Sequence, residues 1–202
     1  TQDLSSSDVS FHALREYVPG DDRRAIHWKT TARVGRFMVR VFEETRKSHL
    51  LVALSVRPED YATPDDFETA VSCAGSLGLQ CLREDRQLSM VTQTGVLRFP
   101  GGPGLLDELS RVELVPGAAP IEALAELAVA RVPAASIVAL VTGGGADPHA
   151  LRAADLAMPL DAFSYAVRCD ATQQPARRRI GRLSVLDLTT LDDLPRAVRT
   201  LR

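Results

Sequence analysis

The side chains best suited to chemistry lie near the amino end of the chain, between His12 and Glu44, in the stretch HALREYVPGDDRRAIHWKTTARVGRFMVRVFEE. A histidine beside a carboxylate is the arrangement of many general bases, and arginine and lysine are common partners of phosphate groups. A phosphate-binding site or a hydrolytic active site could therefore be built here from five residues: Asp21, Asp22, Arg23, His27 and Lys29.

Spacing argues against this hypothesis. His27 follows Asp21 and Asp22 by six and five residues across an expected helix start, so spacing alone does not place the three on one face. No serine or cysteine nucleophile is evident beside them. We therefore expect no catalytic residue here, and a packing or hydrogen-bonding role for His27 and Trp28.

Nucleic-acid binding is the other chemistry that this stretch suggests. Residues 15–47 contain nine Arg or Lys against five Asp or Glu, and Trp28 could stack on a base. The neighbouring carboxylates would repel phosphates, and the whole chain has a formal net charge of -2. We expect no nucleic-acid partner.

The local elements predict an arm over residues 11–47, preceded by a flexible lead over residues 1–10. Pro and Gly favour a turn, Asp favours a helix N-cap, and Gly favours a helix end. The expected elements are an extended segment over 11–18, a turn at Pro19-Gly20, a helix over 23–33 capped by Asp21 or Asp22 and ended by Gly35, and a strand over 36–44.

Residues 48–202 alternate between strand and helix patterns. The nearly continuous apolar run 48–56 is typical of a strand buried on both faces, and we expect it to be the central strand. Further strands are expected over 87–92, 95–99, 135–141, 162–167 and 182–188, and helices over 64–84, 105–110, 121–131, 148–157 and 191–201, with loops at 99–104 and Arg177-Arg178-Arg179. This order predicts an α/β fold with a doubly wound, mostly parallel sheet flanked by helices, and a hairpin at one edge. In such sheets a site forms at the carboxyl ends of the strands, here after Val56 and Val141.

Composition fits a globular chain of 202 residues, 25% charged and 45% apolar. Its three cysteines have no metal-ligand spacing, so we expect buried thiols and a reducing, cytoplasmic setting. The triple glycine after Val141 lacks the Lys-Ser/Thr of a phosphate loop. No run approaches the roughly 18 apolar residues of a membrane span.

The segment LREYVPGDDRRAIHWKTTARVGRFMVRVFEE resembles the signature of the bacterial domain of unknown function 58 family. The resemblance implies a C-terminal region like a von Willebrand factor A domain, over residues 48–202. It also implies a parent protein anchored by membrane helices absent from this sequence, and a partner ATPase of the MoxR type, from the AAA+ class. The cytoplasmic face of a membrane is then the expected location.

Von Willebrand A domains often bind a divalent cation through Asp-x-Ser-x-Ser and a later Thr and Asp. Placed on this chain, the resemblance implies a degenerate site, because the matching positions are Ser55, Arg57, Glu59, Thr92 (or Thr94) and Gly143. Arg57 would also repel a cation. We expect no metal and no cofactor, although Glu59, Asp60 and Asp147 leave a different oxygen site open.

Two hypotheses follow. The favoured one is a non-enzymatic interaction module, and the alternative is the phosphate-binding or hydrolytic protein described above. The direction of the arm's side chains discriminates between them. The signature residues expected to form the interaction surface are Tyr17, Pro19, Gly20, Asp21, Asp22, Arg23, Arg24, His27, Trp28 and Lys29.

Overall fold

The computed structural model describes residues 9–44 and 48–201, which fall into two compact units that divide between Lys47 and Ser48. We call residues 1–47 the signature unit and residues 48–202 the sheet unit. Most of the lead expected over residues 1–10 lies outside the described residues. In the described part of the chain, no helix has the length and apolarity needed to cross a membrane.

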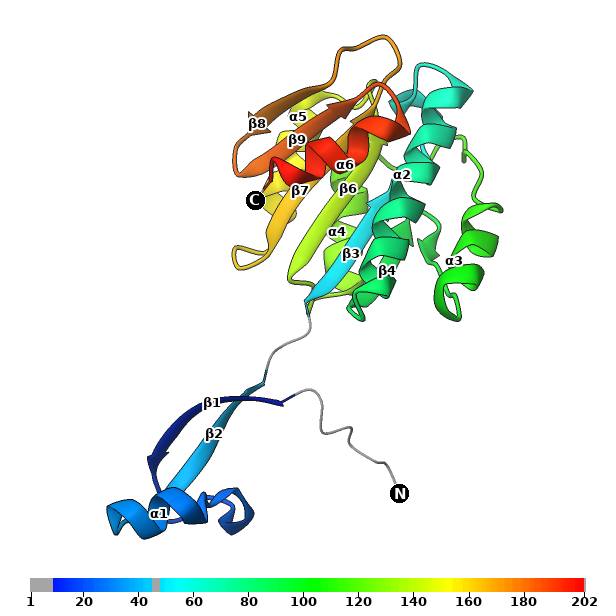
Figure 1. The fold of residues 1–202 in the computed structure, drawn as a ribbon. Helices are drawn as coiled ribbons and strands as arrows, with labels where there is room; N and C mark the ends of the chain where they lie inside the picture. Colours follow the sequence, from blue (N-terminus) through cyan, green and yellow to red (C-terminus); the bar gives the residue numbers. More distant parts are fainter. Residues whose placement is uncertain (1–8, 45–47, 202) are drawn as a thin grey trace. The chain divides into compact units, whose positions relative to one another are not determined.

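The signature unit is built on a two-stranded antiparallel sheet (Figure 1). Strand β1 (Val9–Glu16) pairs with β2 (Met38–Glu44), with an irregularity between Phe11 and Ala13. The connection contains a short 3₁₀ helix η1 (Arg23–Ala25) and the helix α1 (Trp28–Val34). Among the described side chains of this unit, the buried apolar ones are Ile26 and Val39, so its core is very small.

The single helix expected over 23–33 is wrong, because the backbone between η1 and α1 is extended. Ile26 has φ -64 and ψ 125 and forms a bridge to Val39 of β2, and the His27 N–H donates to the Met38 carbonyl at 2.8 Å. Pairing with β2 thus interrupts the helix. The helix end at Gly35 is confirmed, since Gly35 has φ 74 and its N–H donates to the Thr31 carbonyl.

The sheet unit has seven strands in the order β5-β4-β3-β6-β7-β9-β8. The inner strands β3, β4, β6, β7 and β9 run parallel, and the edge strands β5 and β8 are antiparallel to their neighbours. The strands are β3 (His49–Leu54), β4 (Gln87–Thr92), β5 (Gly95–Val96), β6 (Ile137–Gly143), β7 (Phe163–Cys169), β8 (Ala176–Ile180) and β9 (Leu183–Leu188). The predicted doubly wound, mostly parallel α/β fold is confirmed.

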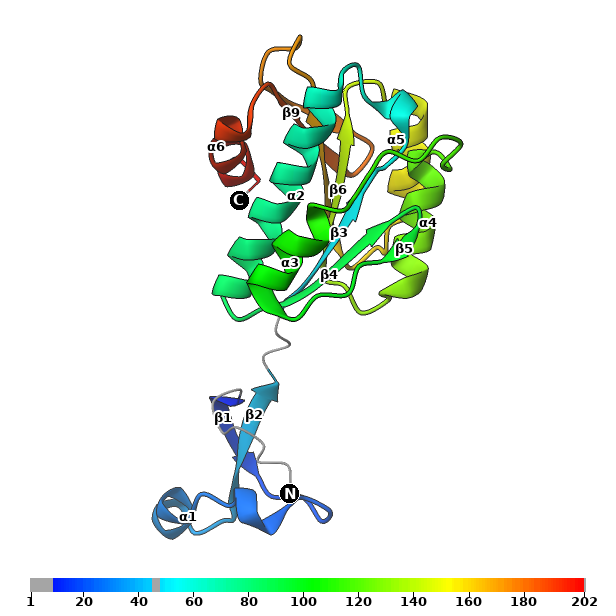
Figure 2. The ribbon, with the colours of Figure 1, turned by 90° about the vertical axis from the view of Figure 1, so that its right-hand side faces the viewer.

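Helices cover both faces of this sheet (Figure 2). On one face lie α2 (Pro64–Arg83), α3 (Gly101–Leu109) and, after the 3₁₀ turn η3 (Leu191–Asp193), α6 (Leu194–Arg199); on the other lie α4 (Ile121–Arg131) and α5 (Pro148–Ala157). Strand β3 supplies Val52 and Leu54 to the first face and Leu51 and Ala53 to the second. Its continuous apolar run is explained by this double burial.

The start of α2 is confirmed, because Thr63 and Asp66 cap each other's backbone in a capping box. All three cysteines are buried and free, with Cys73 and Cys81 on the inner side of α2.

Four expectations for the sheet unit need correction. The middle strand of the seven is β6, and β3 lies one position away from it. The expected loop 99–104 already contains the first turns of α3, and the closing helix begins as η3. The triple arginine belongs to β8, which pairs with β9 from Ala176↔Asp187 to Ile180↔Leu183.

Candidate functional site

The carboxyl ends of β3 and β6 meet at the point where the strand order reverses, which is where ligands bind in such sheets. Here the space is occupied by Asp60, from the 3₁₀ turn η2 (Pro58–Asp60), whose side chain is buried. The Ser55 hydroxyl donates to its carboxylate at 2.6 Å, and the Thr142 hydroxyl donates to the same oxygen at 3.2 Å. The hydroxyl groups of Ser55 and Thr142 are therefore already bonded to a carboxylate of the chain itself, Asp60.

Glycines at the end of β6 allow the η2 turn to approach the strand. A Cβ atom on Gly143 would lie 2.2 Å from the Asp60 carbonyl oxygen, and one on Gly145 would lie 2.6 Å from the Glu59 carbonyl oxygen. The Gly145 N–H donates to the Asp60 carbonyl at 2.9 Å. Gly143 and Gly145 are thus explained by close backbone packing, whereas a Cβ atom on Gly144 would meet the side chain of Asp170.

The side chains of Arg57, Glu59 and Thr92, which are other positions of the expected degenerate cation site, take no part in the hydrogen bonds from Ser55 and Thr142 to Asp60. Arg57 is one-third exposed, and its guanidinium lies 3.1 Å from Glu59 and 3.9 Å from Asp60. Thr92 is hydrogen-bonded to Thr94 at 2.7 Å. The structure brings Ser55 and Gly143 beside Asp60 and leaves Arg57 and Glu59 at the rim.

The different oxygen site left open by the sequence does not assemble either. Asp147 accepts a hydrogen bond from the His149 N–H and caps α5. Within the described ranges 9–44 and 48–201, no three His, Cys, Asp or Glu side chains are grouped as metal ligands.

Sequence reasoning missed a buried ion-pair cluster in the same sheet. Arg168 of β7 lies 3.1 Å from Asp187 of β9, and Arg178 of β8 approaches the other carboxylate oxygen of Asp187 at 2.8 Å. Asp187 is buried, and the Arg168 guanidinium also donates to the Gly144 carbonyl. A signal was present, because Arg168 and Asp187 each interrupt an apolar strand.

In the signature unit, the residues of the enzymatic hypothesis do not converge on a cleft. Asp21 accepts two hydrogen bonds from the Arg15 guanidinium, each 2.7 Å long, and a third from the Val18 N–H. The bonds from Arg15 and Val18 hold the pKa of Asp21 below its usual range. Asp21 thus closes the turn around Pro19 and Gly20, where Gly20 has φ 114.

Asp22 and His27 act as two separate N-caps. The Asp22 carboxylate accepts from the Arg24 N–H at 2.9 Å and caps η1. His27 Nδ1 lies 2.8 Å from the Thr30 hydroxyl and accepts from the Thr30 N–H, which caps α1. The expected hydrogen-bonding role of His27 is therefore confirmed, and the N-cap role expected for Asp21 or Asp22 falls to Asp22.

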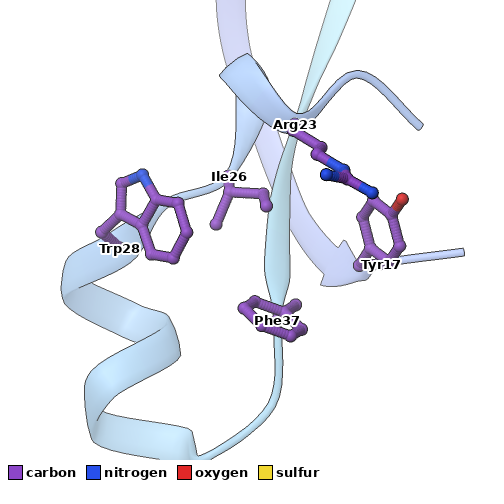
Figure 3. Close-up of a pocket in the computed structure, with 5 residues that line it drawn as sticks. All are labelled: Tyr17, Arg23, Ile26, Trp28 and Phe37. Atoms are coloured by element: carbon purple, nitrogen blue, oxygen red, sulfur yellow. The ribbon is translucent and has the colours of Figure 1, made fainter.

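The same unit carries a groove of about 320 Å³ lined by five residues, Tyr17, Arg23, Ile26, Trp28 and Phe37, which we call the aromatic groove (Figure 3). Trp28 and Arg23 lie toward opposite ends with Ile26 between them, and Phe37 lies across from Ile26. The Trp28 and Phe37 ring centroids are 6.2 Å apart at 87°, and those of Tyr17 and Phe37 are 6.3 Å apart at 67°.

The aromatic groove is open to solvent. Trp28 is 63% exposed and Phe37 is 53% exposed, so Trp28 packs against Phe37 without being buried. Phe37 was not among the residues expected to form the interaction surface, because it was assigned to the strand expected over 36–44. It instead precedes β2, and edge-to-face contacts hold it beside Tyr17 and Trp28.

Three exposed cations belong to the 3₁₀ turn and the helix that contribute to this groove, and one of them, Arg23, lines it. Arg23, Arg24 and Lys29 are exposed, and none of them forms an ion pair with a carboxylate among the described residues. Arg15 and Arg36 are paired, to Asp21 at 2.7 Å and to Glu16 at 3.3 Å.

The molecule thus combines a doubly wound α/β unit, whose usual binding crevice is filled, with a hairpin unit that exposes an aromatic groove. The chain belongs to the family described as "Protein of unknown function DUF58", whose sequence model matches residues 13–140. This confirms the family prediction, and the seven-stranded sheet is consistent with the expected likeness to von Willebrand A domains.

One relative is "Uncharacterized protein YeaD" of Bacillus subtilis (strain 168), which is 35% identical over 65 residues. The aligned part is 32% of this chain and 15% of that protein. The chain therefore matches only a small part of the length of that relative. No solved structure matches the chain.

Proposed function

We propose that the chain is a non-enzymatic interaction module that binds a partner protein through the aromatic groove of its signature unit. The observation that carries the proposal is the exposure of Trp28 and Phe37, at 63% and 53%, on a unit whose described buried apolar side chains are Ile26 and Val39. Large aromatic side chains are enriched at the centres of protein interfaces. Among the described residues of this unit they are the two exposed large aromatic side chains, in addition to exposed Val18 and Val34.

Energetics support docking at this place. Fully burying a large apolar side chain contributes roughly 1.5–3 kcal/mol, and Trp28 and Phe37 each keep more than half of that contribution available to a partner. The groove has already fixed both rings through contacts with Tyr17 and with each other, so a partner would order few side chains on binding.

The geometry elsewhere gives no comparable support to the enzymatic alternative. Asp21, Asp22 and His27 are used in a salt bridge and two helix caps. At the carboxyl edge of the sheet, Asp60 already accepts the hydroxyl hydrogen bonds of Ser55 and Thr142.

We propose a MoxR-type AAA+ ATPase as the partner, on the strength of what the family resemblance implies. The setting that we propose is the cytoplasm or the cytoplasmic face of a membrane, with the module part of a membrane-anchored parent. The surface that would face the ATPase contains Arg23, Arg24 and Trp28, which are all exposed.

The test is a quantitative pull-down of a purified MoxR-type AAA+ ATPase, with the complete chain as bait. Trp28→Ala and Phe37→Ala should each reduce retention by about 30-fold or more, as expected for interface hot spots. Leu156→Ala, which removes a side chain that is 77% exposed in the sheet unit, is the matched control and should leave retention unchanged. Arg57→Ala tests the sheet edge and should also have no effect.

Loss of retention with Arg57→Ala but not with Trp28→Ala would move the docking surface to the sheet. If the wild-type chain retains no ATPase, the partner assignment fails.

A further inference from the structure

We infer that the aromatic groove recognises an acidic peptide segment of its partner, one large apolar side chain of which packs in the groove against Trp28 and Phe37 while flanking carboxylates pair with Arg23 and its basic neighbours. This rests on the proposed function, because it assumes that the groove is the docking site. It adds the chemistry of the ligand.

The size and shape of the groove select the apolar anchor. A volume of about 320 Å³ accepts one or two side chains and is small for a folded element. The walls are the rings of Tyr17, Trp28 and Phe37 with Ile26 between them, so apolar contact dominates. An inserted phenylalanine or leucine would cover the exposed parts of both Trp28 and Phe37.

The charges of the signature unit determine which residues of the peptide should flank its apolar anchor. Arg23 is part of the groove wall, Arg24 follows it in η1, and Lys29 follows Trp28 in α1. These three cations have no carboxylate partner among the described residues, whereas the nearby Asp21 is fully engaged by Arg15. A ligand with carboxylates on either side of its apolar anchor would pair with cations that the unit itself leaves unpaired.

The ring geometry favours a peptide over a single-stranded nucleic acid. Successive bases bind on aromatic rings that present parallel faces along the strand. Here the Trp28 and Phe37 planes meet at 87° and the Tyr17 and Phe37 planes at 67°, so the three rings form a pocket and not a platform. Basic charge alone would attract either ligand, but the pocket accepts a side chain.

Trp28 is the only tryptophan in the chain, so its fluorescence reports on the groove directly. The experiment titrates the complete chain with short synthetic peptides of glycine, aspartate and glutamate that carry one central phenylalanine. Binding should shift the Trp28 emission to shorter wavelength as the ring loses water. Matched peptides replace the phenylalanine with glycine, or the acids with asparagine and glutamine, or the acids with lysine, and a single-stranded oligonucleotide of similar length is the fifth ligand.

We expect the acidic peptide with phenylalanine to bind at least about tenfold more tightly than each of the other four ligands, a difference of about 1.4 kcal/mol. Raising the salt from about 0.05 M to about 0.5 M should weaken its binding, because Arg23, Arg24 and Lys29 are exposed. Anisotropy of a dye-labelled peptide extends the measurement to Trp28→Ala, which should lose binding. Arg23→Glu should lose about tenfold in affinity, and Arg152→Glu, the same charge change on an exposed arginine of α5, should lose none.

Preference for the uncharged or basic peptide, preference for the oligonucleotide, or no saturable binding of any peptide overturns the inference. The peptide titration and the pull-down can fail independently, so their outcomes distinguish the ligand chemistry from the proposed partner. An ATPase that is retained through Trp28 while all peptides fail leaves the proposed function standing and removes the ligand chemistry. A chain that binds the acidic peptide but retains no ATPase leaves the ligand chemistry standing and removes the proposed partner.

Discussion

Gly143→Ala tests whether the crevice at the carboxyl edge of the sheet is closed by the chain's own backbone. The new methyl group would lie 2.2 Å from the Asp60 carbonyl oxygen and 2.6 Å from a ring carbon of Tyr61. An ordinary contact is about 3.4 Å or more, so the η2 turn would have to retreat by about 1.2 Å. That movement strains the 2.9 Å bond from the Gly145 N–H to the Asp60 carbonyl.

Overpacking of this kind costs about 1–3 kcal/mol, and each hydrogen bond lost adds about 1 kcal/mol. With the one hydrogen bond named above, we therefore expect Gly143→Ala to lower the free energy of unfolding of the sheet unit by about 2–4 kcal/mol. Urea denaturation followed by far-ultraviolet circular dichroism measures this loss. Gly102→Ala is the control, because its methyl group would approach only the flexible tip of Leu79, at 3.2 Å, and it should change stability by less than about 1 kcal/mol. A loss below about 1 kcal/mol for Gly143→Ala would refute the closed crevice.

The same position allows a direct test of metal independence. Gly143→Asp restores the carboxylate expected at this place in a von Willebrand A domain, but the approach of the Asp60 carbonyl leaves it no space beside the strand. We expect this variant to be at least as unstable as Gly143→Ala and not to recover with Mg²⁺. A cation that bound only the folded state at 100 times its Kd would add about 2.7 kcal/mol. A saturable stabilisation of that size, in the variant or in the wild type, would show that the closed crevice does not exclude the ion.

Two further predictions concern charged groups. Asp60→Ala should lower the free energy of unfolding by about 2–4 kcal/mol in urea denaturation, because the buried hydroxyl groups of Ser55 and Thr142 lose their acceptor. Asp60→Asn keeps an acceptor oxygen and should lower the free energy of unfolding by less. Equal losses in the two variants would contradict the hydrogen-bond explanation. The pKa of Asp21 is held below its usual value of about 3.9, so the pair with Arg15 stabilises the signature unit above about pH 4 and the contribution is lost as the pH falls through the lowered pKa. A nuclear magnetic resonance titration of the Asp21 carboxyl should show a lowered midpoint that returns toward the usual value in Arg15→Gln, and a normal midpoint in the wild type would remove this role of the salt bridge.

Most of the sheet unit could be predicted from sequence, because its signals are local and repeated. The apolar run of β3 and the three- and four-residue spacing on α2 both follow from burial, and the bounds expected for α4 and α5 agree with the structure. Strand β8 gave no such signal. Its arginines lie on an exposed edge strand, where no hydrophobic alternation is required, so they looked like a solvated loop.

The signature unit was harder to predict because distant pairing overrides local preference. Asp22, the basic residues and Gly35 are the signals of one continuous helix. The bridge between Ile26 and Val39 breaks that helix, and no pattern within residues 23–33 reveals it. The aromatic groove depends on this break, because it leaves Ile26 extended between Arg23 and Trp28.

In both units, the groups that could have formed a reactive site are used to hold the fold together. In the signature unit, the reactive side chains Asp21, Asp22 and His27 are consumed by a tight turn and two caps, and what remains exposed is apolar and cationic. In the sheet unit, the place where a ligand would enter is occupied by Asp60 and closed by glycines. The capped and paired groups fix the shape of the signature unit, and that shape presents Trp28 and Phe37. Asp21, Asp22 and His27 therefore explain how the shape of the groove is maintained. The exposed rings of Trp28 and Phe37 are the observation on which the proposed docking role rests.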